Sequence, residues 1–236
     1  MRSVCRYSVA TLALLCWGHA CAAPYPTEDQ LREAIGEVAG LLKSEGLALE
    51  ILDAGKEGVT RPLMATGLNL ANGVCRVFYN TKPEDGLTQF FDGIHEKDLP
   101  LWLKAMAVHE AAHCFEQREA YVREHFDKVL PPDFRRDNVT IQGYLSAVNS
   151  GALDTWGEAL GDIASVLYLK RAVPGRWAKF ANGLAAMRHD LARKWPAHDT
   201  SAWLYRIIAA EAVVKGANQS LFETAFQLRR QYRPSE

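Results

Sequence analysis

Apolar residues recur at helical intervals near the start of the chain. Thr27 and Gln30 have the spacing of a capping box, in which the two residues satisfy each other's main-chain groups at a helix start. The apolar positions that follow repeat at helical spacing until Gly46, and they are Leu31, Ile35, Val38, Leu41 and Leu42. This pattern predicts one amphipathic helix between Thr27 and Gly46 that packs on the core.

Two short segments have the composition of β-strands. Residues 47–52 alternate apolar side chains with others, and residues 74–79 are rich in β-branched and aromatic side chains. The connection between them is rich in glycine and irregular, with a further short strand expected near residues 59–64. These segments predict a small sheet.

The pattern changes to helices after the strands. Periodicity predicts a short helix before Pro131 and longer helices over residues 99–121, 156–171, 176–194, 201–215 and 220–231. The polar stretch 133–155 is predicted to be a loop with at most one short helix, at residues 144–148. Because strands come first and helices later, we predict an α+β fold with a small N-terminal mixed sheet and a mainly helical C-terminal lobe.

The first residues have the features of an export signal. Arg2 and Arg6 precede an apolar stretch at residues 9–17, and small residues then follow. The apolar stretch is shorter than the roughly 20 residues that span a bilayer. We therefore expect cleavage after Ala22 and no stable membrane insertion of the mature protein.

This cleavage defines the predicted organisation of the chain. Residues 1–22 are expected to be a signal peptide, and residues 23–236 a single domain that is periplasmic or secreted; lipid attachment at Cys21 is the alternative. The chain carries 27 basic and 28 acidic residues, a formal net charge of -1, with no long run of either sign. The charge therefore indicates no nucleic-acid partner, and the composition does not specify an oligomeric state.

Cysteine usage fits an exported protein. Three of the five cysteines precede the expected cleavage site, which leaves Cys75 and Cys114 in the mature chain. Exported proteins occupy compartments that permit disulfides. A single bridge between the two is expected, and two free buried thiols are the alternative.

The sequence His-Glu-x-x-His at residues 109–113 lies inside a segment of helical periodicity. Residues four apart share one face of a helix, so His109 and His113 can reach a single ion. Catalytic zinc is held by three protein ligands at roughly 2.0 to 2.2 Å and keeps one position for water. Glu110 is expected beside that water as general base, and a third ligand must come from elsewhere.

A second helical segment supplies candidates for that ligand. Glu158 and Asp162 lie four positions apart near its start and share one face. A helix-start carboxylate that only interacts with the helix dipole is the alternative for Glu158. Glu116 and Glu119 are poorer ligands because they lie on the same helix as the histidines, and Asp154 is a weaker candidate just before the second helix.

His-Glu-x-x-His followed by a helix with Glu-x-x-x-Asp resembles the gluzincins, the metallopeptidases that include thermolysin. The resemblance covers the two motif-bearing helices and the strand at residues 74–79, which by analogy lines the cleft with its edge. It implies a zincin-like fold and one Zn2+ per chain. It also implies that Glu158 is the third ligand and that Asp162 accepts a hydrogen bond from one of the histidines.

These residues together predict zinc-dependent hydrolysis of peptide bonds in a peptide or protein substrate. A donor should stabilise the negative charge of the transition state, and the candidates are Tyr144, His189, His198 and Tyr205. A zinc amidase acting on a non-protein substrate, such as cell-wall peptide cross-links, is an alternative. A non-catalytic zinc-binding domain is another, although Glu110 is needed only for chemistry.

Overall fold

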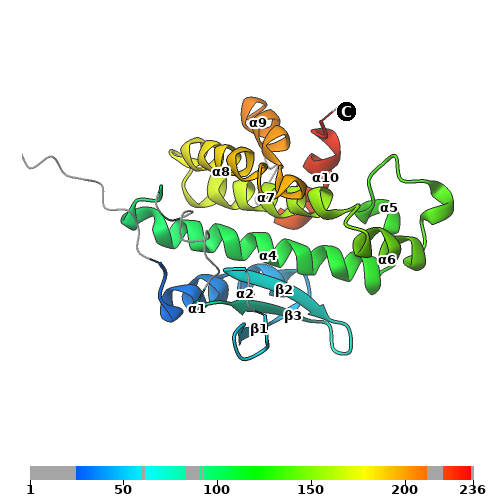
Figure 1. Cartoon of the computed structure of the whole chain (residues 1–236), viewed down its shortest axis with the longest axis horizontal. Coiled ribbons are helices and arrows are strands. Elements are labelled where there is room, and N and C mark those ends of the chain that lie inside the picture. The colour runs from blue at the N-terminus through cyan, green and yellow to red at the C-terminus, as the bar shows by residue number, and fades with distance from the viewer. Residues whose placement is uncertain (1–24, 60–61, 83–90, 92, 212–219, 235–236) are drawn as a thin grey trace, which may run out of the picture.

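The computed structural model describes residues 25–59, 62–82, 91, 93–211 and 220–234. The predicted signal peptide, its cleavage site and Cys21 lie outside the described residues. Figure 1 labels the helices and strands in their order along the chain.

The predicted first helix is two helices. α1, Glu28–Glu37, begins with the expected capping box between Thr27 and Gln30, and α2, Ala39–Ser44, follows after one residue. The break falls at Val38, whose neighbourhood contains two glycines that weaken a continuous helix. The apolar stripe continues across the break because Leu31, Ile35 and Leu42 are all fully buried.

The sheet has three strands in the order β1-β3-β2 and is mixed. β1, Ala48–Asp53, runs parallel to β3, Val74–Tyr79, and β2, Met64–Asn69, runs antiparallel to β3. The strand expected near residues 59–64 was therefore misplaced, because a tight turn ending at Gly73, with φ +69°, sets β2 directly before β3. β3 is the central strand, so the expectation that its edge lines a cleft is wrong; β2 has that edge.

The long helix α4, Leu99–Tyr121, has the predicted bounds and lies between the sheet and the later helices (Figure 1). Its small residues Ala107, Ala111 and Ala112 are fully buried because neighbours pack on both sides. The principal neighbour on the side away from the sheet is α7, Asp154–Ala172. α4 thus forms the middle layer of the fold.

The remaining helical elements are the short η1, which leads directly into α4, and the helices of the lobe beyond α4. They are η1 (Glu96–Asp98), α5 (Phe126–Val129), η2 (Arg136–Asn138), α6 (Ile141–Asn149), α8 (Trp177–Leu191), η3 (Pro196–His198), α9 (Ser201–Ala209) and α10 (Leu221–Gln231). α6 is longer than predicted. α8 ends before the predicted Lys194 because the residue before Pro196 disfavours helix. α9 is also shorter, and residues 212–215 of its predicted range lie outside the described part.

The chain is α+β, with a small N-terminal sheet and a mainly helical remainder, as the order of elements predicts. Among the described residues, no helix combines the length and the apolarity needed to cross a bilayer.

A disulfide joins the sheet to α4. The sulfur atoms of Cys75 on β3 and Cys114 on α4 lie 2.06 Å apart, and both residues are fully buried. The structure thus has the expected bridge in place of two free thiols. It fixes the central strand to the helix one residue after His113.

Candidate metal centre

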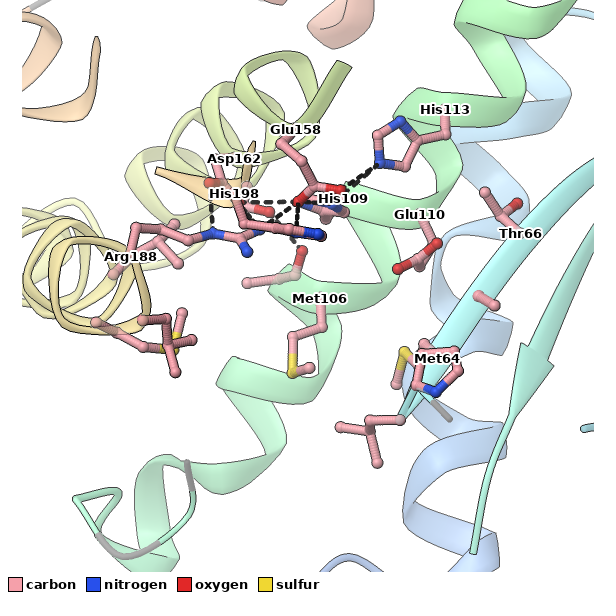
Figure 2. A pocket seen from close by; sticks show the side chains of 18 of the residues that line it. Met64, Thr66, Met106, His109, Glu110, His113, Glu158, Asp162, Arg188 and His198 are labelled. Carbon is pink, nitrogen blue, oxygen red and sulfur yellow. Dashed lines mark hydrogen bonds and ion pairs between the residues drawn. The ribbon is translucent and has the colours of Figure 1, made fainter. Parts of the chain in front are cut away.

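Three potential metal ligands converge between α4 and α7. The Nε2 atoms of His109 and His113 lie 3.0 Å apart (Figure 2). Glu158 Oε2 lies 3.5 Å from His109 Nε2, and Glu158 Oε1 lies 3.9 Å from His113 Nε2. Two tetrahedral ligands of one zinc ion are separated by about 3.4 Å, given the usual bond lengths. The group could therefore hold a single metal ion, and its spacing is close to that of zinc ligands.

The protonation of His113 and Glu158 suits a metal, whereas burial of His109 is outweighed by the facing Glu158 and Asp162, which raise its pKa. Burial, together with the neighbouring His109, lowers the pKa of His113 to about 4, so its imidazole is neutral near pH 7. Burial alone would raise the pKa of Glu158, but the facing His109, His198 and Arg188 outweigh it and lower the pKa. A neutral imidazole and an ionised carboxylate are the forms that bind zinc.

Glycine at position 161 allows α7 to approach the histidines. A Cβ atom built there would stand 2.5 Å from His109 Nδ1, closer than any side chain tolerates, whereas one at Gly157 would meet Glu116 and His113 no closer than 3.6 Å. Gly161 therefore leaves the space that the His109 imidazole occupies. The sequence analysis did not predict this role of Gly161, although a glycine directly before Asp162 could have indicated a close helix contact.

Asp162 orients His109. Its Oδ1 lies 2.9 Å from His109 Nδ1, and the residue is 1% exposed. Burial opposes the charge of Asp162, but Arg188 and His109 more than compensate and lower its pKa to about 2. An ionised acceptor at Nδ1 places the Nδ1 proton there and leaves Nε2 free to bind a metal.

Arg188 on α8 joins the two acidic side chains, and the sequence reading missed it. It donates from Nε to Asp162 Oδ2 at 2.7 Å, from Nη2 to Asp162 Oδ1 at 2.7 Å, and from Nη2 to Glu158 Oε2 at 2.9 Å (Figure 2). Thr200 also donates to Asp162 Oδ2. The buried negative charges beside the histidines are thereby paired before any metal binds.

Glu110 projects from α4 toward β2, on the cavity side of the helix (Figure 2). Burial is the largest influence on this carboxyl and raises its pKa to about 7. A carboxylate with such a pKa, next to a metal-ligand group and facing a cavity, is suited to accept and release a proton near neutral pH.

The three other candidate ligands, Glu116, Glu119 and Asp154, lie outside the metal-ligand group. Glu116 accepts a hydrogen bond from Arg229 at 2.7 Å, and Glu119 lies among basic side chains at the end of α4. Asp154 is exposed in the first turn of α7. None of the three belongs to the metal-ligand group formed by the described residues.

Two cavities meet at the centre. The larger, of about 630 Å³, extends along α4, β2 and α8, and the smaller, of about 370 Å³, extends toward α6. His113, Gln117, Glu158 and His198 line both. The ligand group thus lies at the junction of two spaces.

Comparisons with protein-family models, with curated proteins and with solved structures give no match.

The four candidate donors are placed differently. His198 on η3 lines both cavities, and its Nδ1 lies 3.2 Å from Glu158 Oε2. Tyr144 is 4% exposed, packs against Tyr121 and lines only the smaller cavity. His189 and Tyr205 are exposed and line neither cavity. The structure brings His198 alone of the four beside the ligand group.

Proposed function

We propose that this chain is a zinc-dependent peptidase of the gluzincin type, which hydrolyses peptide bonds in an exported setting. The observation that carries the proposal is Glu110. It follows a predicted ligand directly on α4, faces the larger cavity, and has a pKa raised by burial to about 7. Zinc binding alone does not require a carboxyl group at this place, so Glu110 favours a catalytic role.

His109, His113 and Glu158 would hold one zinc ion per chain. Zinc supplies, when bound, the Lewis acid that polarises the scissile carbonyl and acidifies a water molecule. Asp162 and Arg188 fix the ligands around it, through His109 Nδ1 and Glu158 Oε2 respectively. The local fold therefore supports a site assembled before the metal arrives.

Glu110 then accepts a proton from the attacking water and returns it to the leaving amine. His198 is our choice as the donor that stabilises the negative charge on the carbonyl oxygen, because it alone of the four candidates adjoins the ligand group. Arg188 lies in the same wall, but its side chain is 13% exposed and donates to both Glu158 and Asp162, whereas the His198 side chain is 44% exposed.

The edge of β2 is suited to hold the substrate main chain. The Leu63 carbonyl accepts from Asn80 N on the β3 side, whereas Leu68 N donates away from β3 to Gln117. Because main-chain groups alternate in direction along a strand, those of Met64 and Thr66 also face away from β3. Both residues line the larger cavity, so an extended peptide could pair with them.

This arrangement supports the zincin-like form of the α+β fold. A mixed sheet with an antiparallel edge strand lies against the helix that carries His-Glu-x-x-His, and the edge borders the cavity at the ligands. The implied gluzincin membership remains our proposal and rests on this geometry together with the motif.

Hydrolysis of an unfolded protein by the zinc-loaded enzyme tests the function, with Glu110→Gln as the matched variant. We expect wild type to cleave it and the variant to lose at least about 100-fold in rate while retaining zinc, because general-base catalysis contributes about that much. Peptidoglycan is offered in parallel. If wild type cleaved peptidoglycan and left the unfolded protein intact, the substrate would be reassigned. Equal rates for wild type and Glu110→Gln would contradict the role of Glu110.

A further inference from the structure

The two cavities differ in the chemistry of their walls. The larger is bordered by Met64, Met106 and Met187, which are all the methionines of the chain apart from Met1, and by Trp102 and Leu184. Methionine side chains are unbranched and adaptable, so they can pack around large apolar groups of different shapes. This wall favours a bulky apolar side chain.

The smaller cavity contains acidic and aromatic residues. Glu116 and Asp154 line it together with the rings of Tyr144 and Trp156, and none of the described residues that line it is a lysine or an arginine. Glu116 is paired with the buried Arg229, whereas Asp154 is exposed. Because Glu116 is paired, Asp154 is the carboxylate of the two that would repel an acidic side chain, so the cavity favours neutral or basic groups.

The place where the two cavities meet indicates whether a terminal or a chain-internal peptide bond would lie at the metal-ligand group. His113, Glu158 and His198 belong to both walls, so space for the substrate continues on each side of the metal-ligand group. An exopeptidase site would need a wall that ends the cleft and binds a chain terminus. Two continuing cavities instead fit a chain that extends in both directions.

We infer that the site cleaves bonds within a polypeptide chain, with a bulky apolar residue in the methionine-lined cavity and a neutral or basic residue in the smaller one. This inference rests on the proposed function. It names a substrate class, chain-internal bonds between residues of unlike character, that neither the motif nor the ligand geometry specifies.

Ten-residue peptides of glycine and serine, blocked at both ends, test it. Each peptide has one of five central pairs, which are Lys-Leu, Leu-Lys, Asp-Leu, Leu-Asp and Gly-Gly. Two further peptides carry the Lys-Leu or the Leu-Lys pair at an unblocked end. Binding is measured by calorimetry to the zinc-loaded Glu110→Gln variant, and cleavage by wild type is measured by mass spectrometry. The binding readout does not depend on catalysis.

We expect one order of the internal lysine–leucine pair to bind at least about tenfold more tightly than Gly-Gly, as burial of one apolar side chain allows. Replacing lysine by aspartate should lower that affinity, and wild type should cut beside the leucine. Equal affinities for all peptides, or cleavage restricted to the unblocked ends, would overturn the inference. The expected binding without any cleavage would instead overturn the hydrolase proposal and leave the cleft assignment in place.

Val148→Trp tests the smaller cavity separately. Val148 is 38% exposed on α6 and lines that cavity, so a larger side chain can fill it without disturbing the core. Affinity for the preferred internal peptide should fall about tenfold, whereas Val148→Ile, a small enlargement, should lose far less. Thermal unfolding verifies that both variants fold. Unchanged affinity in Val148→Trp would contradict a substrate path through the smaller cavity.

Discussion

Gly161 lies directly beneath the imidazole of His109. A methyl group at position 161 would stand 2.5 Å from His109 Nδ1, in the space where that nitrogen meets Asp162. The close approach of α7 to α4, and with it the position of Glu158 relative to both histidines, therefore depends on the absence of a side chain at this position.

Gly161→Ala should weaken zinc binding by roughly 10- to 100-fold, the range seen when groups that orient metal ligands are disturbed. Gly157→Ala is the matched control, because it lies one turn earlier on α7 and its methyl group has room. That control should stabilise the helix by up to about 1 kcal/mol. Zinc titration against a competing chelator measures both. Equal affinities would show that the His109 position does not require Gly161.

Arg188→Met should destabilise the metal-free protein by about 3 to 5 kcal/mol, because it leaves the buried carboxylates of Asp162 and Glu158 without their cation. Zinc supplies positive charge at the same place, so the loss should be smaller in the zinc-loaded form. Urea unfolding of both forms measures this difference.

Arg176→Met is the control for Arg188→Met. Arg176 precedes the same helix and pairs with Asp98, but its side chain is 53% exposed, so its loss should cost no more than about 1 kcal/mol. If Arg188→Met lowered the stability of both forms equally, Arg188 would have no special relation to the metal centre.

Reduction of the disulfide should lower the free energy of unfolding by about 4 kcal/mol, because the bridge closes a loop with a sequence separation of 39. Unfolding with and without reductant measures this. A Cys75→Ala, Cys114→Ala double variant should match the reduced protein and no longer respond to reductant. Peptide mapping that finds both thiols free in the exported protein would contradict the bridge.

Glu119 should make stability depend on pH in the acid range. Burial alone would raise its pKa, but hydrogen bonds from His125, Lys128 and Arg118 outweigh it and hold the pKa at about 2. A group whose pKa is lower in the folded state contributes stability above its unfolded pKa of about 4.5. That contribution, about 3 kcal/mol, is lost as the pH falls toward 2.

Unfolding between pH 2 and 7 measures this for wild type and Glu119→Gln. The variant should be less stable at neutral pH and should vary less with pH, whereas Glu57→Gln, at an exposed carboxylate, should follow wild type. Parallel curves for wild type and Glu119→Gln would contradict the assignment.

The elements with strong local signals were predictable from the sequence. The capping box at Thr27 and the bounds of α4 are correct because local periodicity and packing favour the same structure there. The predicted position of β2 was wrong because Ala65 and Gly67 give the strand weak local preference for β structure. Its position depends instead on the hairpin that it forms with β3.

The candidate site was predictable only where spacing along one helix determines it. His109 and His113 lie on one face by helix geometry, and Glu158 was expected through the second motif. Arg188 and His198 could not be identified, or chosen among rivals, because their contacts depend on how α8 and η3 pack against α7. Such packing leaves no fixed interval in the sequence.

We propose above all that Glu158 completes a zinc site with the two histidines. Elemental analysis of the purified mature protein measures it, with Glu158→Ala and, as a control in the same helix, Asp154→Ala. We expect about one zinc per chain in wild type and in Asp154→Ala, and a sharp drop in Glu158→Ala. Equal zinc in all three would assign the third ligand elsewhere, and no zinc in wild type after gentle reconstitution would contradict the metal centre itself.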